Sequence, residues 1–184
     1  MNILKKEDLA PQFQKLQFLQ DYSAQTRIKG VQLIDLKHFS DEGGFFMELC
    51  RLGKGALEPF PEFEVKQINY SEVHPGVIKA AHLHFFQEDV WVVPPTSKLL
   101  IGLLDARKDS PTSGKTMRFI MGEGRSRALY IPRGVAHGYA NHSTKDAGLI
   151  YFVNNQFNSD PEKTDEKRLP WNAFGAEFWD VARG

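Results

Sequence analysis

The chain of 184 residues has almost no cysteine and no excess of charge of either sign. Its one cysteine, Cys50, cannot form a disulfide within the chain, which is typical of a protein from a reducing compartment. The 23 basic and 23 acidic side chains cancel, whereas proteins that bind nucleic acids or anionic membranes are normally basic. We therefore expect neither a nucleic acid nor a membrane among its partners.

Long apolar runs are also missing from the sequence. No stretch approaches the roughly 18 consecutive apolar residues of a membrane-spanning helix. The first residues, Met1 to Asp8, become charged too early for a signal peptide. No repeat of solenoid period is present either. These absences predict a cytoplasmic protein with one domain large enough to bury a core.

The chain does contain many short apolar segments, rich in its 14 phenylalanines and separated by glycine and proline. Segments of this kind favour β-strands. The strand candidates are residues 31–36, 45–50, 63–70, 77–85, 90–93, 98–105, 116–121, 128–131 and 149–153. Many short strands without helices between them indicate an antiparallel sandwich or barrel.

One helix is expected ahead of these strands. Apolar residues recur at helical spacing from Asp8 to about Gln25, and Pro11 stands in the first turn. We take residues 1–29 as an N-terminal helical extension and residues 30–184 as a single domain. The helix is expected to cover one end of the barrel or a partner subunit.

Two segments in the middle of the chain carry the histidines of a candidate site. Residues 76–88 have the pattern G-x5-H-x-H-x3-E, and residues 132–141 have the pattern P-x-G-x2-H-x3-N. Alternate side chains of a strand share one face, so the first two histidines point the same way. Such a group suits a divalent metal such as zinc, iron, manganese or nickel. The candidate metal ligands are His82, His84, Glu88 and His137. A hydrogen-bonded polar cluster and a metal-free site are the alternatives.

The two motifs resemble the two signature motifs of the cupin superfamily. That resemblance implies an all-β fold, the cupin double-stranded β-helix or jelly roll. In metal-binding cupins the ligands fall on the positions of the same four residues.

A closer resemblance, from about Leu33 to Trp179, is to the dTDP-4-dehydrorhamnose 3,5-epimerase family. The matching segments include Asp41 to Glu48, Gln67 to Ser71, Gly76 to His82, Leu104 to Lys115 and Ile131 to Gly138. That family moves protons at the carbons beside a keto group of a nucleotide-linked sugar, and no organic cofactor is expected.

The same resemblance implies roles for individual residues. His82 would be the catalytic base, and Tyr151 the opposing acid. The substrate-binding positions are Glu48, Gln67, Asn69, Lys79 and His137. The family also implies a homodimer whose N-terminal strands are shared between subunits.

Several family positions are changed in this chain. Lys79 replaces a phosphate-binding arginine, Gly43 removes another, and the family's active-site lysine falls near Val90. The aspartate that orients the base belongs to a Ser-x-Lys-Asp segment that is not found here, and Asp180 is the nearest candidate. The two roles of His82 also conflict, since a ring nitrogen bound to a metal cannot accept a proton.

The sequence therefore predicts a divergent epimerase-like or isomerase-like cupin acting on a dTDP-linked 4-keto-6-deoxysugar, with or without a metal. One alternative is a metal-dependent cupin enzyme, a dioxygenase or an isomerase, acting on another small molecule. The other is a non-catalytic sugar-binding cupin.

Overall fold

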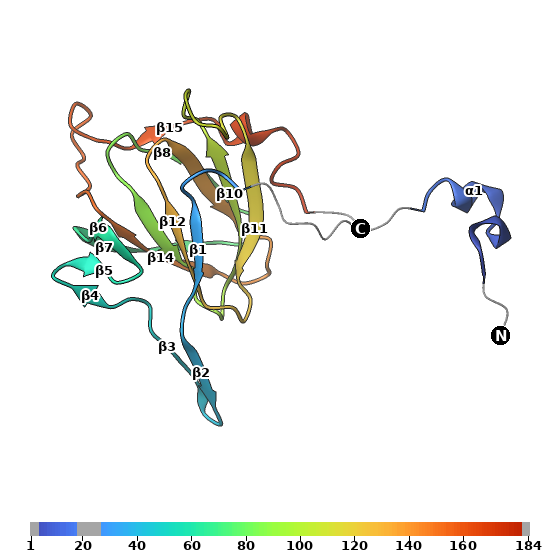
Figure 1. Ribbon diagram of the computed structural model, residues 1–184, viewed down its shortest axis with the longest axis horizontal. Coiled ribbons are helices and arrows are strands. Elements are labelled where there is room, and N and C mark those ends of the chain that lie inside the picture. Colours follow the sequence, from blue (N-terminus) through green and yellow to red (C-terminus); the bar gives the residue numbers. More distant parts are fainter. Residues whose placement is uncertain (1–3, 18–26, 182–184) are drawn as a thin grey trace.

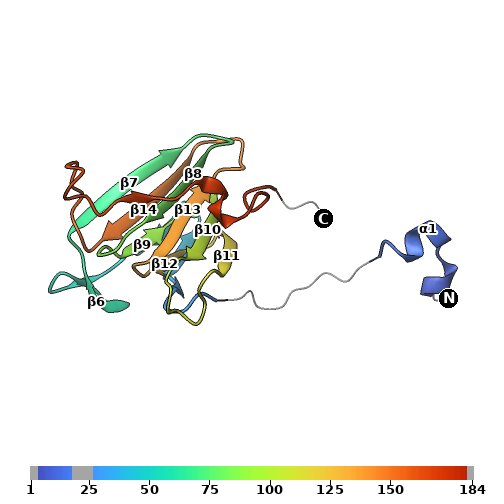
Figure 2. The ribbon, with the colours of Figure 1, turned by 90° about the horizontal axis from the view of Figure 1, so that it is seen from above.

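A computed structural model describes residues 4–17 and 27–181 of the chain, and most of them form a barrel of two facing antiparallel sheets (Figures 1 and 2). The first sheet contains, in order, β1 (Gln32–Asp35), β12 (Arg127–Ile131), β9 (Asp89–Val92), β14 (Ala147–Val153) and β7 (Gln67–Val73). The facing sheet contains, in order, β11 (Thr116–Gly122), β10 (Lys98–Asp105), β13 (Val135–Ala140), β8 (Ile78–Leu83) and β15 (Lys167–Arg168). The predicted all-β jelly roll is confirmed.

Two small sheets precede the barrel strands. They are the hairpin of β2 (His38–Asp41) and β3 (Gly44–Met47), and the sheet of β4 (Leu52–Gly53), β5 (Ala56–Leu57) and β6 (Phe60–Glu64). The β2–β3 hairpin projects away from the barrel in Figure 1. In the described part of the chain no helix is long and apolar enough to cross a membrane.

The core explains why β10 is an almost continuous apolar run. Leu99, Ile101 and Leu103 face the barrel interior, where they pack with residues of the opposite sheet. The other face of β10 is covered by the segment after β15, which contains the 3-10 helix η2 (Trp171–Phe174), since Leu100 packs with Phe174 and Trp179. A strand buried on both faces needs apolar residues at successive positions instead of alternating ones.

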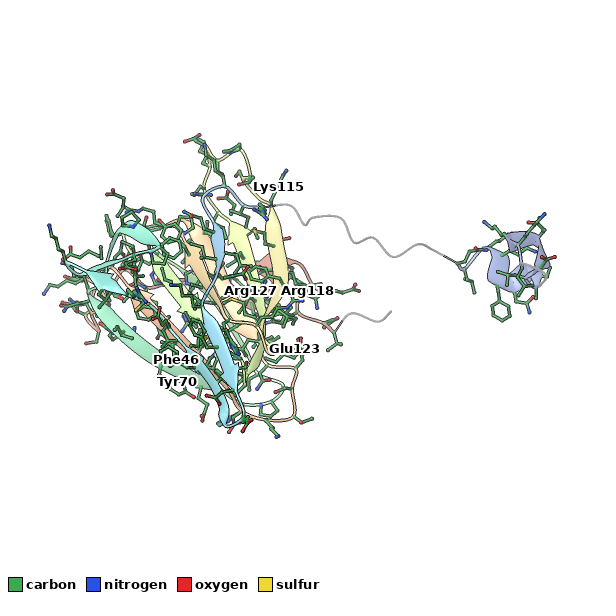
Figure 3. The ribbon with its side chains drawn as sticks, turned by 60° about the horizontal axis from the view of Figure 1, so that its bottom comes forward. Phe46, Tyr70, Lys115, Arg118, Glu123 and Arg127 are labelled. Carbon is green, nitrogen blue, oxygen red and sulfur yellow. The ribbon has the colours of Figure 1, made fainter. Side chains whose placement is uncertain are left out.

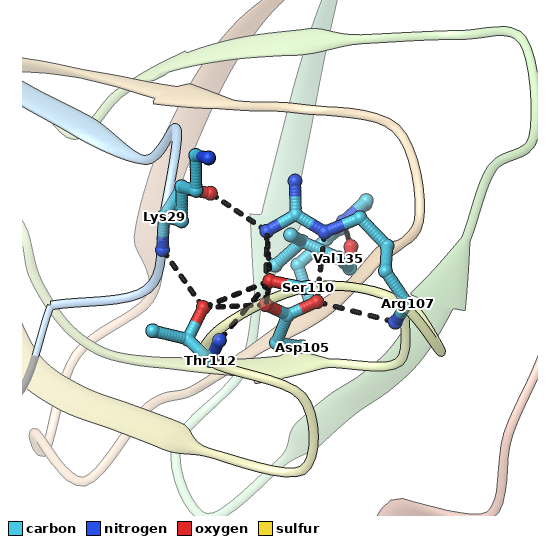
Figure 4. A network of polar contacts seen from close by, with 7 residues as sticks. Lys29, Asp105, Arg107, Ser110, Thr112 and Val135 are labelled. Carbon is cyan, nitrogen blue, oxygen red and sulfur yellow. Dashed lines mark hydrogen bonds and ion pairs between the residues drawn. The ribbon is translucent and has the colours of Figure 1, made fainter.

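The end of β10 is tied to its neighbours by a polar network around Asp105 (Figure 4). The buried Asp105 carboxylate accepts hydrogen bonds from Arg107, Ser110 and Thr112, and Arg107 also donates to the backbone oxygen of Lys29. Burial alone would raise the pKa of Asp105, but these hydrogen bonds together hold it well below its ordinary value. The network is structural and lies outside the pocket described below.

In the described part of the N-terminal segment, the predicted helix is shorter than its pattern suggests. Within residues 4–17 there is a 3-10 helix, η1 (Lys6–Asp8), and one turn of α-helix, α1 (Pro11–Gln14). Neither has a buried residue, and Phe13 is 56% exposed. So short a helix gains little stability without packing, and within residues 4–17 it covers no part of the barrel. Residues 18–25 of the predicted helix lie outside the described residues.

Candidate active site

A cavity of about 330 Å³ lies between the two sheets. Strands β7, β9 and β14 supply one wall, and β8 and β13 supply the other. Segment 164–168, which we call the C-terminal strap, contributes to the rim. Six of the predicted site residues line this cavity: Gln67, Asn69, His82, His84, His137 and Tyr151.

The register of β8 against β13 brings the three predicted histidines together. His82 pairs directly with His137, and their ring centres lie 6.0 Å apart. The ring of His84 lies 5.2 Å from that of His137. Gly138 permits this close approach of the strands, because a Cβ there would lie 2.4 Å from the Cβ of Ala80.

The structure does not bring Glu88 to the histidines. Its carboxylate accepts hydrogen bonds from Arg133 and from the side-chain amide of Asn154, each at 3.1 Å. Its neighbour Asp89 points into the pocket instead, and carboxylate and imidazole atoms of Asp89, His84 and His137 lie within 4.8 Å of one another.

The local backbone explains why Asp89, and not Glu88, points into the pocket. The chain turns tightly after β8, and the buried carboxylate of Asp165 accepts backbone hydrogen bonds from Phe85, Phe86 and Gln87. Strand β9 therefore starts at Asp89, and alternation puts Asp89 and Trp91 on the pocket face.

Two further predicted residues lie outside the cavity lining. The Glu48 carboxylate pairs with Arg51 at 2.8 Å, in the chain segment that follows the β2–β3 hairpin. The Lys79 ammonium donates to the Ser71 hydroxyl at 3.2 Å and to the Glu72 carbonyl at 2.6 Å. Neither side chain lines this cavity, whereas the sequence predicts both as substrate-binding residues.

A carboxylate that sequence reasoning missed lies next to His82. The Nε2 atom of His82 is 3.6 Å from a carboxylate oxygen of Glu166 in the C-terminal strap. Pairing of β15 with β8 places the strap there, with Arg168 opposite His82. The predicted candidate Asp180 is exposed, and its backbone carbonyl accepts a hydrogen bond from Arg118. Glu166 stands within a charged run, so its sequence context looks like an ordinary solvated surface.

Burial sets the protonation states in the pocket. Burial, together with the nearby His137 and Arg168, lowers the pKa of His82 to about 3. Burial also lowers the pKa of His137, so both rings are neutral at pH 7. Burial raises the pKa of Tyr151, whose hydroxyl consequently keeps its proton. The pocket thus holds an unprotonated imidazole and a protonated phenol.

Comparison with known proteins identifies the scaffold around this pocket. The family model described as dTDP-4-dehydrorhamnose 3,5-epimerase matches residues 25–174. The chain belongs to this family.

Among curated proteins, the spore coat polysaccharide biosynthesis protein SpsL of Bacillus subtilis is 42% identical over 145 residues, covering 79% of this chain and 91% of that protein. The dTDP-4-dehydrorhamnose 3,5-epimerase of Shigella flexneri is 30% identical and covers 80% of each chain. The crystal structure of dTDP-4-dehydrorhamnose 3,5-epimerase from Sulfolobus tokodaii superposes with a TM-score of 0.67 at 29% identity, covering 85% of each chain.

Membership in the dTDP-4-dehydrorhamnose 3,5-epimerase family confirms the closer resemblance found in the sequence. The protein is an isomerase of the epimerase type with a cupin fold. His82 and Tyr151 line one cavity from two different sheets.

Proposed function

We propose that this enzyme epimerises a dTDP-linked 4-keto-6-deoxysugar, with His82 as base and Tyr151 as acid. The observation that carries the proposal is that both side chains line one cavity, His82 from β8 and Tyr151 from β14, with Glu166 at 3.6 Å from His82. The name of the Shigella flexneri relative supports the substrate class.

The chemistry follows from the protonation states. A carbon beside a keto group loses its proton to a base on one face and regains a proton from an acid on the other. Neutral His82 accepts the proton, and the Glu166 carboxylate stabilises the imidazolium that forms. The Tyr151 hydroxyl donates from the opposite sheet. Gln67 and Asn69 supply neutral hydrogen-bonding groups for the sugar. Proton transfer of this kind needs no organic cofactor.

Exchange with solvent tests this proposal. In deuterated water, the enzyme is expected to introduce deuterium beside the keto group of dTDP-4-keto-6-deoxyglucose, because every epimerisation passes through loss of that proton. Nuclear magnetic resonance of the sugar measures the exchange at carbon 3 and carbon 5 separately, with an enzyme-free sample as background. Exchange no faster than in that sample would refute the epimerase proposal.

A second candidate is a metal-dependent cupin enzyme acting on another small molecule. The pocket favours a cation, because its described lining contains Asp89, Asp165 and Glu166 but no lysine or arginine. We also propose that it takes up a divalent ion, zinc, iron, manganese or nickel. Stoichiometric metal without solvent exchange would favour this candidate. Tight binding of a dTDP-sugar with neither metal nor exchange would point to a non-catalytic sugar-binding cupin.

We propose a homodimer as the working assembly. Strand β7 has the reverse of the usual burial pattern. Its polar residues Gln67 and Asn69 face the pocket, whereas its apolar residues Ile68 and Tyr70 are 55% and 64% exposed. The projecting hairpin carries Phe46, which is 60% exposed, and Figure 3 shows Phe46 and Tyr70 at the same edge of the molecule. Exposed apolar surface of this kind is typical of an interface and supports the proposed dimer. A shared hairpin would also bring the following segment, with Glu48, toward the second subunit.

The dimer predicts a specific effect on molecular mass. Sedimentation velocity is expected to give twice the 20.9 kDa of one chain for the unmodified protein, and a lower mass for Phe39→Ser in the hairpin. Phe13→Ser is the matched control, because Phe13 and Phe39 are both 56% exposed but only Phe39 belongs to the hairpin. A monomeric unmodified protein, or equal effects of the two variants, would contradict the shared hairpin.

A further inference from the structure

Two histidines of the pocket turn their Nε2 atoms toward a shared buried carboxylate. The Nδ1 atom of His137 lies 2.9 Å from the carbonyl oxygen of Val135, and Nδ1 of His84 lies 3.2 Å from the carbonyl oxygen of Asp165. A carbonyl oxygen can only accept a hydrogen bond, so Nδ1 carries a proton in each ring. The Nε2 atom of each ring is therefore the one that can bind a metal, and that of His84 lies 3.3 Å from the side-chain amide nitrogen of Gln87.

A buried carboxylate completes the group. The Oδ2 atom of Asp89 lies 3.7 Å from Nε2 of His137 and accepts a hydrogen bond from the Trp91 indole at 2.9 Å. Its Oδ1 atom accepts a hydrogen bond from the Gln87 amide at 2.8 Å. His84, Asp89 and His137 are only 7%, 3% and 3% exposed. Three possible metal-binding atoms thus lie within 4.8 Å of one another, away from bulk water.

A buried carboxylate and two imidazole nitrogen atoms this close together form a favourable site for a positive charge, because charges are poorly screened away from bulk water. We infer that a divalent transition-metal ion is bound by Nε2 of His84, Nε2 of His137 and a carboxylate oxygen of Asp89. The inference names the ligands of the ion proposed above and rests on that proposal.

The donor set fits such an ion. Two imidazoles and one carboxylate are a recurrent set for zinc and for non-haem iron, and they leave coordination positions open for a substrate. The surroundings also fit, because hydrogen bonds from ligands to carbonyl groups fix the orientation and basicity of metal-binding histidines. When bound, an ion in this position supplies Lewis-acid chemistry to a keto oxygen.

This ligand set separates metal binding from proton transfer. His82 is not part of the group, and its Nε2 atom faces Glu166 instead. Glu88 is also outside it, because Arg133 and Asn154 occupy its carboxylate. The same pocket therefore contains a metal group and a base group that share no residue, so the conflict between two roles for His82 does not arise.

Cobalt binding tests the ligand set. The purified full-length protein, stripped of metal, is titrated with Co²⁺, and uptake is followed by visible absorption and elemental analysis. One ion per chain is expected. Asp89→Asn and His84→Ala are each expected to weaken binding at least about 10–100-fold, the loss known for residues that merely support metal ligands. His82→Asn and Glu88→Gln, the matched controls, are expected to bind Co²⁺ as the unmodified protein does.

Three results would overturn the inference. They are no stoichiometric uptake by the unmodified protein, equal losses for His82→Asn and Asp89→Asn, and full retention of binding by both ligand variants. Thermal unfolding of each variant shows whether the fold is intact, and Asp89→Asn keeps the volume of the side chain if His84→Ala does not fold. The two proposals fail separately. Solvent exchange without Co²⁺ uptake would remove the ion but keep the epimerase, and uptake without exchange would do the reverse.

Discussion

Replacing His82 by asparagine is expected to slow solvent exchange into the sugar by about 10²–10⁴-fold, the usual contribution of a general base. His82 is the only described histidine of the pocket that faces a carboxylate of the C-terminal strap. Asparagine keeps hydrogen-bonding capacity but cannot accept a proton at neutral pH. Deuterium incorporation under single-turnover conditions measures the loss without a contribution from product release.

Two companion variants separate the base from its surroundings. Glu166→Gln is expected to lower kcat less than the loss of His82 does and to leave KM nearly unchanged, because Glu166 acts through His82. Glu166→Asp should restore part of the rate. His142→Gln, which changes an exposed histidine away from the pocket, should leave the rate unaltered. A His82→Asn enzyme that retains more than about a tenth of the rate would exclude His82 as the base.

The free energy of unfolding is expected to fall as the pH drops below about 6.5, well before ordinary carboxylates titrate. The pKa of His82 is about 3 in the folded protein against an ordinary value of 6.5, so the unfolded chain binds the proton more tightly. The stability that depends on neutral His82 is fully present above about pH 6.5 and is lost progressively as the pH falls toward 3. At pH 5, His82 alone accounts for about 2 kcal/mol by the linkage of pKa to stability, and the lowered pKa of His137 adds to it.

Urea denaturation between pH 7.5 and 4.5 in the presence of a chelator measures this dependence without interference from metal. His82→Gln should flatten the curve, whereas His142→Gln should not. The lowered pKa of Asp105 also costs stability in acid, but only below about pH 4, where that carboxyl begins to protonate in the unfolded chain. The raised pKa of His74, which comes from its hydrogen bond to Asp146, acts in the opposite sense at a fully exposed site. A flat curve down to pH 4.5 would contradict the buried neutral histidines.

The fold could be predicted largely because most barrel strands are apolar and separated by turns. Strand β13 is absent from the strands that the sequence predicts, although it carries His137. Its residues, Val135–Ala140, include two alanines and a glycine, which have low β-propensity. All of them are buried, since β8 and β10 flank the strand and Gly138 lies against Ala80. Small residues are needed here because the neighbouring strands pack closely. The spacing of apolar and polar residues along the chain does not reveal this tertiary requirement.

The site was predictable where motif spacing determined it and less so where the backbone left the regular strand. His82, His84 and His137 follow from their two motifs, and all three line the pocket. Glu88 and Asp89 differ by one position, and the choice between them depends on the turn that Asp165 holds. That turn is formed by residues far apart in the chain, so spacing alone could not place the carboxylate. The same applies to Glu166, which reaches His82 only through the pairing of β15 with β8.

The C-terminal strap is expected to open at a lower free energy than the barrel needs to unfold. It joins the barrel through β15, a two-residue strand at the edge of its sheet, whereas β8 and β13 lie inside that sheet. Short edge segments open at much lower free energy than central strands. Such an opening would withdraw Glu166 from His82 and Asp165 from the turn before Asp89 while the barrel stays folded. The fraction of molecules able to react would then be set by this local equilibrium, and an inactive molecule could still show every spectroscopic sign of being native.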